Sequence, residues 1–306
     1  MRAATYDAYA RDNATLTCGE VPDPKVGPGQ VLIEVRAAGV NPVDWKVMAG
    51  GLDGMMDAVF PVIPGWDVAG VVSACGPDTP EFAPGDEVMA YARKDSVHAG
   101  TFAQYVSVAA PAVARRPVTL SWEEAGGLPL TGLTALRTLD RLDVTAGDTL
   151  LVLGASGGVG SIALQLARER GVRVLGTASP RNHDYVRHLG GEPLTYEGDV
   201  AAAVRDLVPG GVDAVADFAG GQLQVALAAL APGGRLASIA DPGVERHGGH
   251  WVWVRPDGGK LDELGALAER GVLTVTVSSA FPLEEVGAAF DASRTGHTRG
   301  KLVIVP

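Results

Sequence analysis

A group of glycines between an apolar segment and a helical pattern is the stretch of this sequence best suited to binding a ligand. Residues 149–153 are apolar or β-branched, and they lead into glycines at positions 154, 157 and 160. Glycine permits a tight turn, a positive φ and a close approach of backbone to ligand. Apolar residues from Ile162 to Ala167 then follow helical spacing. The first N–H groups of such a helix can bind an anion such as a pyrophosphate.

The context of these glycines predicts a dinucleotide-binding turn, because that fingerprint requires a strand before the glycines and a helix after them. We therefore expect the cofactor to contact Ser156, Gly157, Gly158 and Val159. The spacing is Gly-x-x-Gly-x-x-Gly, which departs from the strict Gly-x-Gly-x-x-Gly. The alternative is an ordinary strand-to-helix turn of an α/β domain.

The residues after the second expected strand indicate which dinucleotide is bound. An NAD site places an acidic residue about twenty positions after the glycines, where it binds the ribose hydroxyls. Residues 177–182 contain no carboxylate, and the first one, Asp184, lies past the turn. Ser179 and Arg181 instead offer a hydroxyl and a guanidinium, which suit a 2′-phosphate. The sequence therefore favours NADP(H), although Arg181 alone is also compatible with a solvated loop arginine.

Two further strand ends are expected to meet the cofactor. Phe218 and Ala219 follow the apolar segment 212–217, and Ile239 and Ala240 end the segment 234–239. In a parallel sheet, ligands bind beyond the carboxyl ends of the strands. These four residues are therefore predicted to contact the dinucleotide.

The elements that position these residues fall into two regions. Residues 1 to about 120 read as short strands separated by Pro and Gly turns, which indicates a compact barrel or sandwich. From Ser121, which opens a helix by a capping box with Glu124, strands and helices alternate as in a doubly wound parallel sheet. Helices are expected over 221–231, 260–270 and 283–293. The final strand, 301–305, can rejoin the sheet of the first region, so that the parallel sheet becomes an insertion.

Composition excludes several classes of function. The 306 residues are 46% hydrophobic and 20% charged, which describes a folded protein. A net charge of −11 disfavours nucleic acid and anionic membranes as partners. Two distant cysteines, Cys18 and Cys75, cannot build a disulfide framework or a Cys-x-x-Cys pair. The sequence shows no apolar signal core and no apolar run of about eighteen residues, so we expect a cytoplasmic protein.

Several motifs in series resemble the medium-chain dehydrogenase/reductase superfamily, and most closely its zinc-free quinone oxidoreductase branch, which includes ζ-crystallin. Besides the glycine turn, they span residues 39–46, 61–70, 100–106, 128–135 and 296–301. The resemblance implies an α/β fold with a Rossmann doubly wound parallel sheet inserted into a GroES-like, mostly β domain. It places the GroES-like domain at 1–120 plus 272–306, and the NADP-binding Rossmann domain at 121–271.

The residues that bind zinc in related enzymes are absent here. Zinc-dependent relatives have Cys at the position of Asn41 and a His-Glu pair at Trp66 and Asp67. An amide and an indole cannot replace the thiolate and imidazole ligands that catalytic zinc requires. The cysteines of a structural zinc lobe are also missing, because no Cys follows Cys75. The resemblance therefore predicts no metal site.

Without a Lewis acid, the expected acceptor is a small molecule that is already electron-poor. We therefore expect hydride transfer from NADPH to a quinone or to the β-carbon of an α,β-unsaturated carbonyl. By resemblance, Asn41, Thr131 and Lys301 line the nicotinamide half of the site, and Tyr196 lies near the adenine or its phosphate. The candidates for a proton relay, with Asn41, are Asp44 and Lys46; both are also compatible with an ion pair or a helix-start carboxylate.

Two other functions fit the same fold. One is a trans-acting enoyl reductase of a biosynthetic pathway, for which Arg93 and Lys94 offer a small basic patch. The other is a structural or sensor protein that binds NADPH without turnover, because no catalytic acid is obvious. A homodimer is plausible by resemblance, although no residue requires it.

Overall fold

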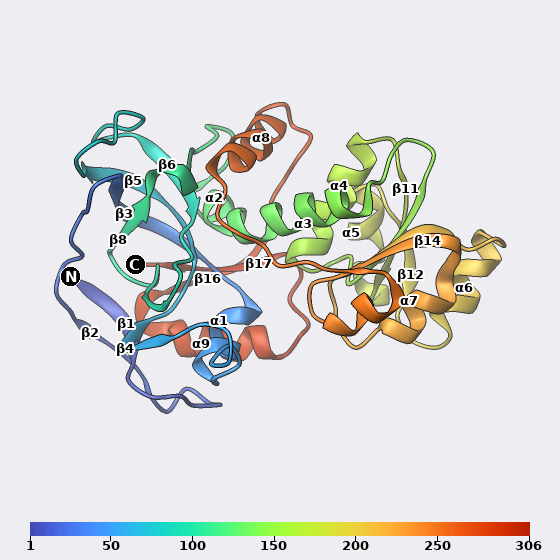
Figure 1. Ribbon diagram of the computed structural model, residues 1–306, viewed down its shortest axis with the longest axis horizontal. Helices are drawn as coiled ribbons and strands as arrows, with labels where there is room; N and C mark the ends of the chain where they lie inside the picture. The colour runs from blue at the N-terminus through green and yellow to red at the C-terminus, as the bar shows by residue number, and fades with distance from the viewer. The chain divides into compact units, whose positions relative to one another are not determined.

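The computed structural model describes all 306 residues and divides them into two compact units. Residues 1–130 and 255–306 form the first, which we name the β-rich unit. Residues 131–254 form the second, which we name the parallel-sheet unit. Figure 1 shows the chain leaving the first unit and returning to it. The chain therefore has the inserted arrangement that the sequence predicted.

A seven-stranded sheet organises the β-rich unit around the strand β3 (Gln30–Val40). Val31, Ile33 and Val35 alternate with more exposed residues along β3, which is the period of a strand with one buried face. The order β16-β17-β3-β5-β6-β9 comprises Val277–Pro282, Lys301–Val305, β3, Asp67–Cys75, Glu87–Tyr91 and Val113–Arg115. An additional strand, β8 (Tyr105–Ala109), also pairs with β3.

A smaller sheet completes the strands of this unit. Its order is β2-β1-β4-β7, with bounds Leu16–Glu20, Arg2–Tyr6, Ala58–Ile63 and Val97–Ala99. The unit also contains α1 (Pro42–Met48), α2 (Trp122–Gly127), α8 (Gly258–Glu269), α9 (Val286–Arg294) and the 3-10 helices η1 (Ala110–Ala112) and η4 (Leu283–Glu285).

The strand β17 joins a distant part of the sequence to the centre of the β-rich unit. It pairs antiparallel with the end of β3, with Leu302 opposite Val40 and Ile304 opposite Ala38. This pairing confirms the prediction that the last strand rejoins the first sheet. It also brings Lys301 next to the residue that follows β3, Asn41.

The β-rich unit is larger than the expected 1–120 and 272–306, because it extends to residue 130 and resumes at residue 255. Residues 121–130 belong to it because α2 packs closely on β3: a Cβ on Gly126 would lie 2.9 Å from the carbonyl oxygen of Ala37. Residues 255–271 belong to it because α8 packs on β9, where a Cβ on Gly258 would lie 2.4 Å from the carbonyl oxygen of Val113. The predicted capping box at the start of α2 is present, with Ser121 and Glu124 each accepting from the other's backbone N–H.

The parallel-sheet unit contains six strands in the order β12-β11-β10-β13-β14-β15, and all its pairs are parallel. This order, 3-2-1-4-5-6 along the chain, is that of a Rossmann fold. The strands are Glu192–Thr195, Arg173–Ala178, Thr149–Leu153, Val212–Asp217, Leu230–Ser238 and His250–Trp251. The fold class is therefore confirmed.

Helices accompany this sheet as Figure 1 shows. They are α3 (Pro129–Leu142, which begins in the β-rich unit), α4 (Gly158–Glu169), α5 (His183–His188), α6 (Val200–Leu207), α7 (Leu223–Ala229), η2 (Pro180–Asn182) and η3 (Pro242–His247). No helix in the structure is both long enough and apolar enough to cross a membrane.

One boundary in this unit differs from the expected one. The helix predicted over 221–231 ends at Ala229, and β14 begins at Leu230. Leu230 pairs with Val212, and after an irregular stretch Arg235 pairs with Ala214. The turn residues 232–234 therefore lie inside a strand as a bulge, because pairing with β13 overrides their local preference.

Candidate active site

The glycine turn lies between β10 and α4, as predicted. Gly154 ends the strand with a φ of 84°, a conformation that favours glycine. Its N–H donates to Oγ1 of Thr177 at 3.0 Å, and the N–H of Ala155 donates to the carbonyl of the same residue at 2.9 Å. The end of β11 therefore fixes the start of the turn.

The start of α4 has the close backbone packing that a phosphate-binding turn needs. A Cβ on Gly160 would lie 2.2 Å from the carbonyl oxygen of Gly154, so any other residue there would push the helix from the turn. Gly157 caps the helix without a side chain, and Ser161 donates to the carbonyl of Gly158 at 3.1 Å. The first N–H groups of this twelve-residue helix have no partner within the helix, so the turn fits a pyrophosphate.

A buried asparagine connects the glycine turn to the loop that follows β11. Nδ2 of Asn182 donates to the hydroxyl oxygens of Ser156 and Ser179, each at 3.2 Å. Sequence reasoning proposed both serines for the cofactor but did not propose Asn182. A single asparagine in a loop gives no sequence signal, because its two partners come from different strand ends.

Arg181 lies in η2, two residues after Ser179, and its side chain is exposed. The first carboxylate after this loop, Asp184, forms an ion pair with Arg187 at 2.6 Å. Tyr196 follows β12 and is 50% exposed. Thr131, in α3, is buried. The strand ends therefore carry Ser179, Arg181 and Tyr196 as the sequence expected.

Two buried side chains organise the other strand ends. Asp217, the last residue of β13, accepts from the N–H groups of Ala219 and Gly220 at 3.0 and 2.9 Å and from the hydroxyl of Ser238 at 2.8 Å. Ser238, the last residue of β14, accepts from the N–H groups of Ala240 and Asp241. The loops predicted to contact the cofactor, 218–219 and 239–240, are thus joined by one hydrogen-bond network. Sequence reasoning missed Asp217 and Ser238, although a carboxylate ending an apolar strand is a visible signal.

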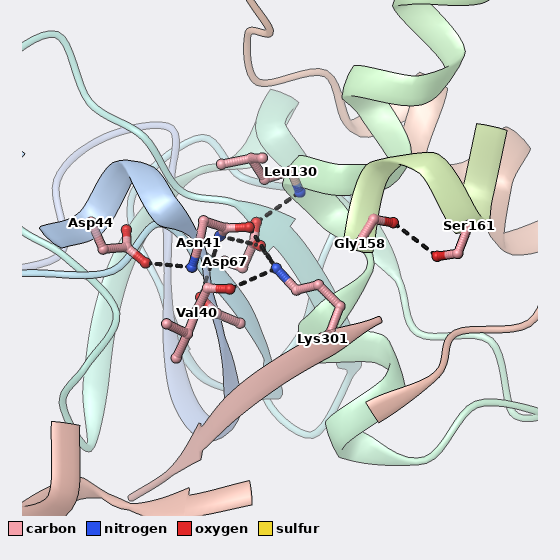
Figure 2. Close-up of polar contacts among 9 residues, drawn as sticks. Val40, Asn41, Asp44, Asp67, Leu130, Gly158, Ser161 and Lys301 are labelled. Atoms are coloured by element: carbon pink, nitrogen blue, oxygen red, sulfur yellow. Dashed lines mark hydrogen bonds and ion pairs between the residues drawn. The ribbon is translucent and has the colours of Figure 1, made fainter. Parts of the chain in front are cut away.

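A second cluster lies within the β-rich unit, where Figure 2 shows the predicted site residues Asn41 and Lys301 in contact with Asp67, which was not predicted as a site residue. Nδ2 of Asn41 donates to Oδ2 of Asp67 at 2.8 Å. Nζ of Lys301 donates to Oδ1 of Asn41 and to the carbonyl oxygen of Val40, the latter at 2.9 Å. It also lies 3.7 Å from Oδ2 of Asp67, whose Oδ1 accepts from the N–H of Leu130.

Local sequence explains why these groups can come so close. A Cβ on Gly39 would lie 2.8 Å from Oδ2 of Asp67 and 2.5 Å from the carbonyl oxygen of Gly126. Only glycine therefore leaves room for the carboxylate and for α2 beside β3. Pro42 then starts α1 immediately after Asn41, which fixes the position of the amide.

The cluster is almost fully enclosed: Asn41, Asp67 and Lys301 are 1%, 0% and 3% exposed. Burial raises the pKa of Asp67 to about 6, and the Lys301 ammonium and the Asn41 amide oppose that rise. Burial lowers the pKa of Lys301, and the carboxylates of Asp67 and Asp44 oppose that change. Each charge of this pair is thus stabilised by the other.

The other two candidates for the proton relay lie in different environments. Asp44 is 3% exposed, and its Oδ2 accepts from the N–H of Asn41 at 2.8 Å, so it is a helix-start carboxylate of α1. Burial, with the nearby charge of Asp67, raises the pKa of Asp44 to about 8. Lys46 is exposed, with its Nζ 5.4 Å from the ring centre of Trp45.

The residues present do not fit a catalytic zinc ion. The amide of Asn41 is bonded to Asp67 and Lys301, so the nearest cation to these side chains is an ammonium. Trp66 is buried and packs edge-on against Tyr91, with ring centres 6.2 Å apart. No group of three or more His, Cys, Asp or Glu side chains is arranged to hold a metal ion.

Comparisons with known proteins agree with this organisation. Residues 27–118 match the alcohol dehydrogenase GroES-like domain family, and residues 191–304 match the zinc-binding dehydrogenase family. A chloroplastic quinone oxidoreductase of Triphysaria versicolor is 33% identical, covering 100% of this chain and 98% of its own. A chloroplastic NADPH-dependent alkenal/one oxidoreductase of Arabidopsis thaliana is 32% identical, covering 100% of this chain and 80% of its own.

Solved structures show the same similarity. The quinone oxidoreductase of Coxiella burnetii has a TM-score of 0.91 at 31% identity, covering 100% of this chain and 99% of its own. A mycobacterial protein complexed with NADPH has a TM-score of 0.88 at 28% identity, with both chains covered fully. Similarity in sequence and in structure thus both support a Rossmann sheet inserted into a GroES-like unit. The chain belongs to the medium-chain dehydrogenase/reductase superfamily, as an oxidoreductase of its quinone oxidoreductase branch that binds a pyridine nucleotide.

Proposed function

We propose that this protein transfers hydride from NADPH to a quinone or to the β-carbon of an α,β-unsaturated carbonyl, without zinc. The observation that carries this proposal is the buried cluster of Asn41, Asp67 and Lys301. By resemblance, the amide of Asn41 stands where zinc-dependent relatives have a cysteine ligand, and this amide is bonded to the ammonium of Lys301. The relatives named for quinone and alkenal reduction support the same acceptor class.

The acceptor class follows from what the donor set can supply. Catalytic zinc polarises an ordinary carbonyl as a Lewis acid, and its ligands are thiolate, imidazole or carboxylate. An amide that is already bonded to an ammonium is a poor ligand, so the acceptor has to be electron-poor before hydride arrives. Hydride addition to an enone leaves an enolate, which then requires a proton. Asp44 and Lys46 are the proposed sources of that proton.

The preference for NADPH over NADH rests on the loop after β11. Ser179 and Arg181 offer a hydroxyl and a guanidinium, and the first carboxylate after them in the sequence, Asp184, is paired with Arg187. A guanidinium favours a 2′-phosphate, whereas a carboxylate would repel it. The alkenal reductase of Arabidopsis thaliana is named as NADPH-dependent, and a mycobacterial structure contains NADPH, which supports this assignment.

In the proposed reaction, one group of residues binds the cofactor and another orients the loops around it. Bound NADPH supplies the hydride. The glycine turn, with Ser156, Gly157, Gly158 and Val159, would hold the pyrophosphate at the start of α4. Asp217 and Ser238 orient the loops that carry Phe218, Ala219, Ile239 and Ala240. Productive orientation, rather than activation by a metal, is then the main contribution of the protein.

A panel assay of NADPH oxidation tests the proposal. Quinones, enones and enoyl thioesters are each mixed with purified, chelator-treated protein and NADPH, and the absorbance of NADPH is followed. We expect turnover with quinones or enones. Turnover with enoyl thioesters alone would favour the trans-acting enoyl reductase, and binding of NADPH without oxidation by any acceptor would favour a sensor. Activity that appears only when zinc is added would contradict the proposal.

Location and assembly stay predictions. A cytoplasmic location and a homodimer are both proposed from the sequence. Size-exclusion chromatography with light scattering would measure the assembly, and a mass of one chain in solution would contradict the dimer.

A further inference from the structure

Two buried polar atoms of the β-rich unit have no hydrogen-bond partner within the protein, and their residues line the same small cavity. They are Oδ1 of Asp44, at the start of α1, and the hydroxyl oxygen of Tyr6, at the end of β1. Asp44 is 3% exposed and Tyr6 is 1% exposed. Buried polar groups of this kind are normally satisfied, because an unpaired donor or acceptor destabilises the folded state.

The cavity has the size and the chemistry of a site for one water molecule. Its volume is about 10 Å³, and its other lining residues include Val47, Ile63 and Trp66. A buried water requires roughly this volume and at least two polar partners. The carboxyl of Asp44 and the hydroxyl of Tyr6 are two such partners.

We propose that one water molecule bridges Oδ1 of Asp44 and the hydroxyl of Tyr6, and that this site holds Asp44 as a neutral carboxylic acid. Oδ2 of Asp44 accepts from the N–H of Asn41 at 2.8 Å, so the proton resides on Oδ1 and points into the cavity. In one arrangement, the water accepts hydrogen bonds from the acid and from the phenol. In the other, it accepts from the acid and donates to the phenol oxygen. Both orphaned atoms are satisfied in either arrangement.

The charges around Asp44 fit a neutral acid. Asp67 and Lys301 form the nearest ion pair, and they act in opposite directions on Asp44. Burial is the largest influence and raises the pKa of Asp44 to about 8. Asp44 and Tyr9 are the titratable groups that act on Tyr6. The hydroxyl of Tyr9 already donates a hydrogen bond to Asp53 at 2.5 Å. A neutral Asp44 leaves the buried cluster with one cation and one anion, whereas an ionised Asp44 would add an unpaired negative charge.

Infrared spectroscopy of the protein without NADPH or acceptor tests the protonation state. A protonated carboxyl has a carbonyl stretch well above the carboxylate bands, and we expect one such band at pH 7. Asp44→Asn should remove the band. Tyr6→Phe should shift it, because the water loses one partner. Tyr105→Phe, which removes a half-buried tyrosine hydroxyl that does not line the cavity, is the matched control and should leave the band unchanged.

A high-resolution crystal structure of the unliganded protein tests the water itself. We expect density for one water within hydrogen-bonding distance of Oδ1 of Asp44 and of the Tyr6 hydroxyl, and its loss or displacement in Tyr6→Phe. A direct bond between Asp44 and Tyr6, or a pH 7 spectrum without the acid band, would overturn the proposal. Because neither measurement uses cofactor or acceptor, their outcome is independent of the proposed reductase activity.

Discussion

Asn41 shows how a neutral side chain can be held in one orientation by charges of opposite sign. Its amide N–H₂ faces the carboxylate of Asp67, and its amide oxygen faces the ammonium of Lys301. A flip of the amide would place donor against donor and acceptor against acceptor. The amide is therefore a fixed dipole in an environment that excludes water.

Removal of the cation tests this arrangement. Lys301→Met leaves the carboxylate of Asp67 buried without a counter-charge, so we expect a loss of about 3–5 kcal/mol in the free energy of unfolding. Urea unfolding followed by circular dichroism measures it. The double variant Lys301→Met with Asp67→Asn removes both charges and should regain much of the loss. Equal stability of the single variant and the wild type would show that the pair does not stabilise the fold.

Protonation of Asp44 makes stability depend on pH. Its pKa rises from 3.8 in the unfolded chain to about 8 in the fold, so the folded state binds the proton more tightly. The stabilisation from this group is complete below pH 3.8 and is lost as pH rises through about 8, at up to about 1.4 kcal/mol per pH unit. Asp44→Asn should flatten this fall in unfolding experiments between pH 4 and 8. Asp184→Asn, at a surface carboxylate, should leave the fall unchanged.

Arg181 tests the choice of dinucleotide. Charge-assisted hydrogen bonds contribute about 1.5–3 kcal/mol, so Arg181→Ala should raise the Kd of NADPH roughly 10- to 100-fold. The Kd of NADH should change little, because it lacks the 2′-phosphate. Quenching of protein fluorescence measures both constants. An equal loss of affinity for the two cofactors would rule out a contact with the phosphate.

At the scale of elements, the hydrogen-bond network beyond β13 and β14 replaces backbone pairing where the strands end. Ser238 has a donor and acceptor role at once: its hydroxyl donates to Asp217 and accepts from two N–H groups of its own loop. One hydroxyl therefore connects the loop after β13 with the loop after β14. Such a connection preorganises the cofactor loops on rigid strands.

Ser238→Ala removes this connection without adding bulk. The buried carboxylate of Asp217 loses one partner, so the free energy of unfolding should fall by about 1–3 kcal/mol. The Kd of NADPH should rise roughly tenfold, since loop ordering is then required on binding. Ser238→Thr keeps the hydroxyl and should restore most of the affinity. Wild-type affinity in Ser238→Ala would show that the loops are ordered by other contacts.

The whole molecule contains one unit built from a single stretch of chain and one built from two. The β-rich unit needs β17 beside β3 and Lys301 beside Asp67. A protein shortened to residues 1–254 lacks both, so its β-rich unit should not fold. Limited proteolysis should then digest residues 1–120 before residues 131–254, whereas the full chain should resist digestion in both. Equal protection of the two segments in the shortened protein would contradict this dependence.

The sequence predicted the features that arise from neighbouring residues. The glycine turn and the capping box of Ser121 and Glu124 were correctly predicted, because each depends on a few consecutive positions. The resemblance placed Asn41 and Lys301 in the same site, but their hydrogen bonds and the part of Asp67 were not predicted, because Lys301 and Asn41 are 260 residues apart and meet through pairing of β17 with β3. The strand pairing at Leu230 was missed for the same reason, since a distant partner overrides the local turn signal.

The pairing of β17 with β3 also sets an order of events during synthesis. The ribosome completes Asp67 and the whole nucleotide-binding insertion before it adds the lysine that neutralises that carboxylate. A nascent chain can therefore fold its Rossmann half while the flanking half still lacks β16, β17 and the ammonium of Lys301.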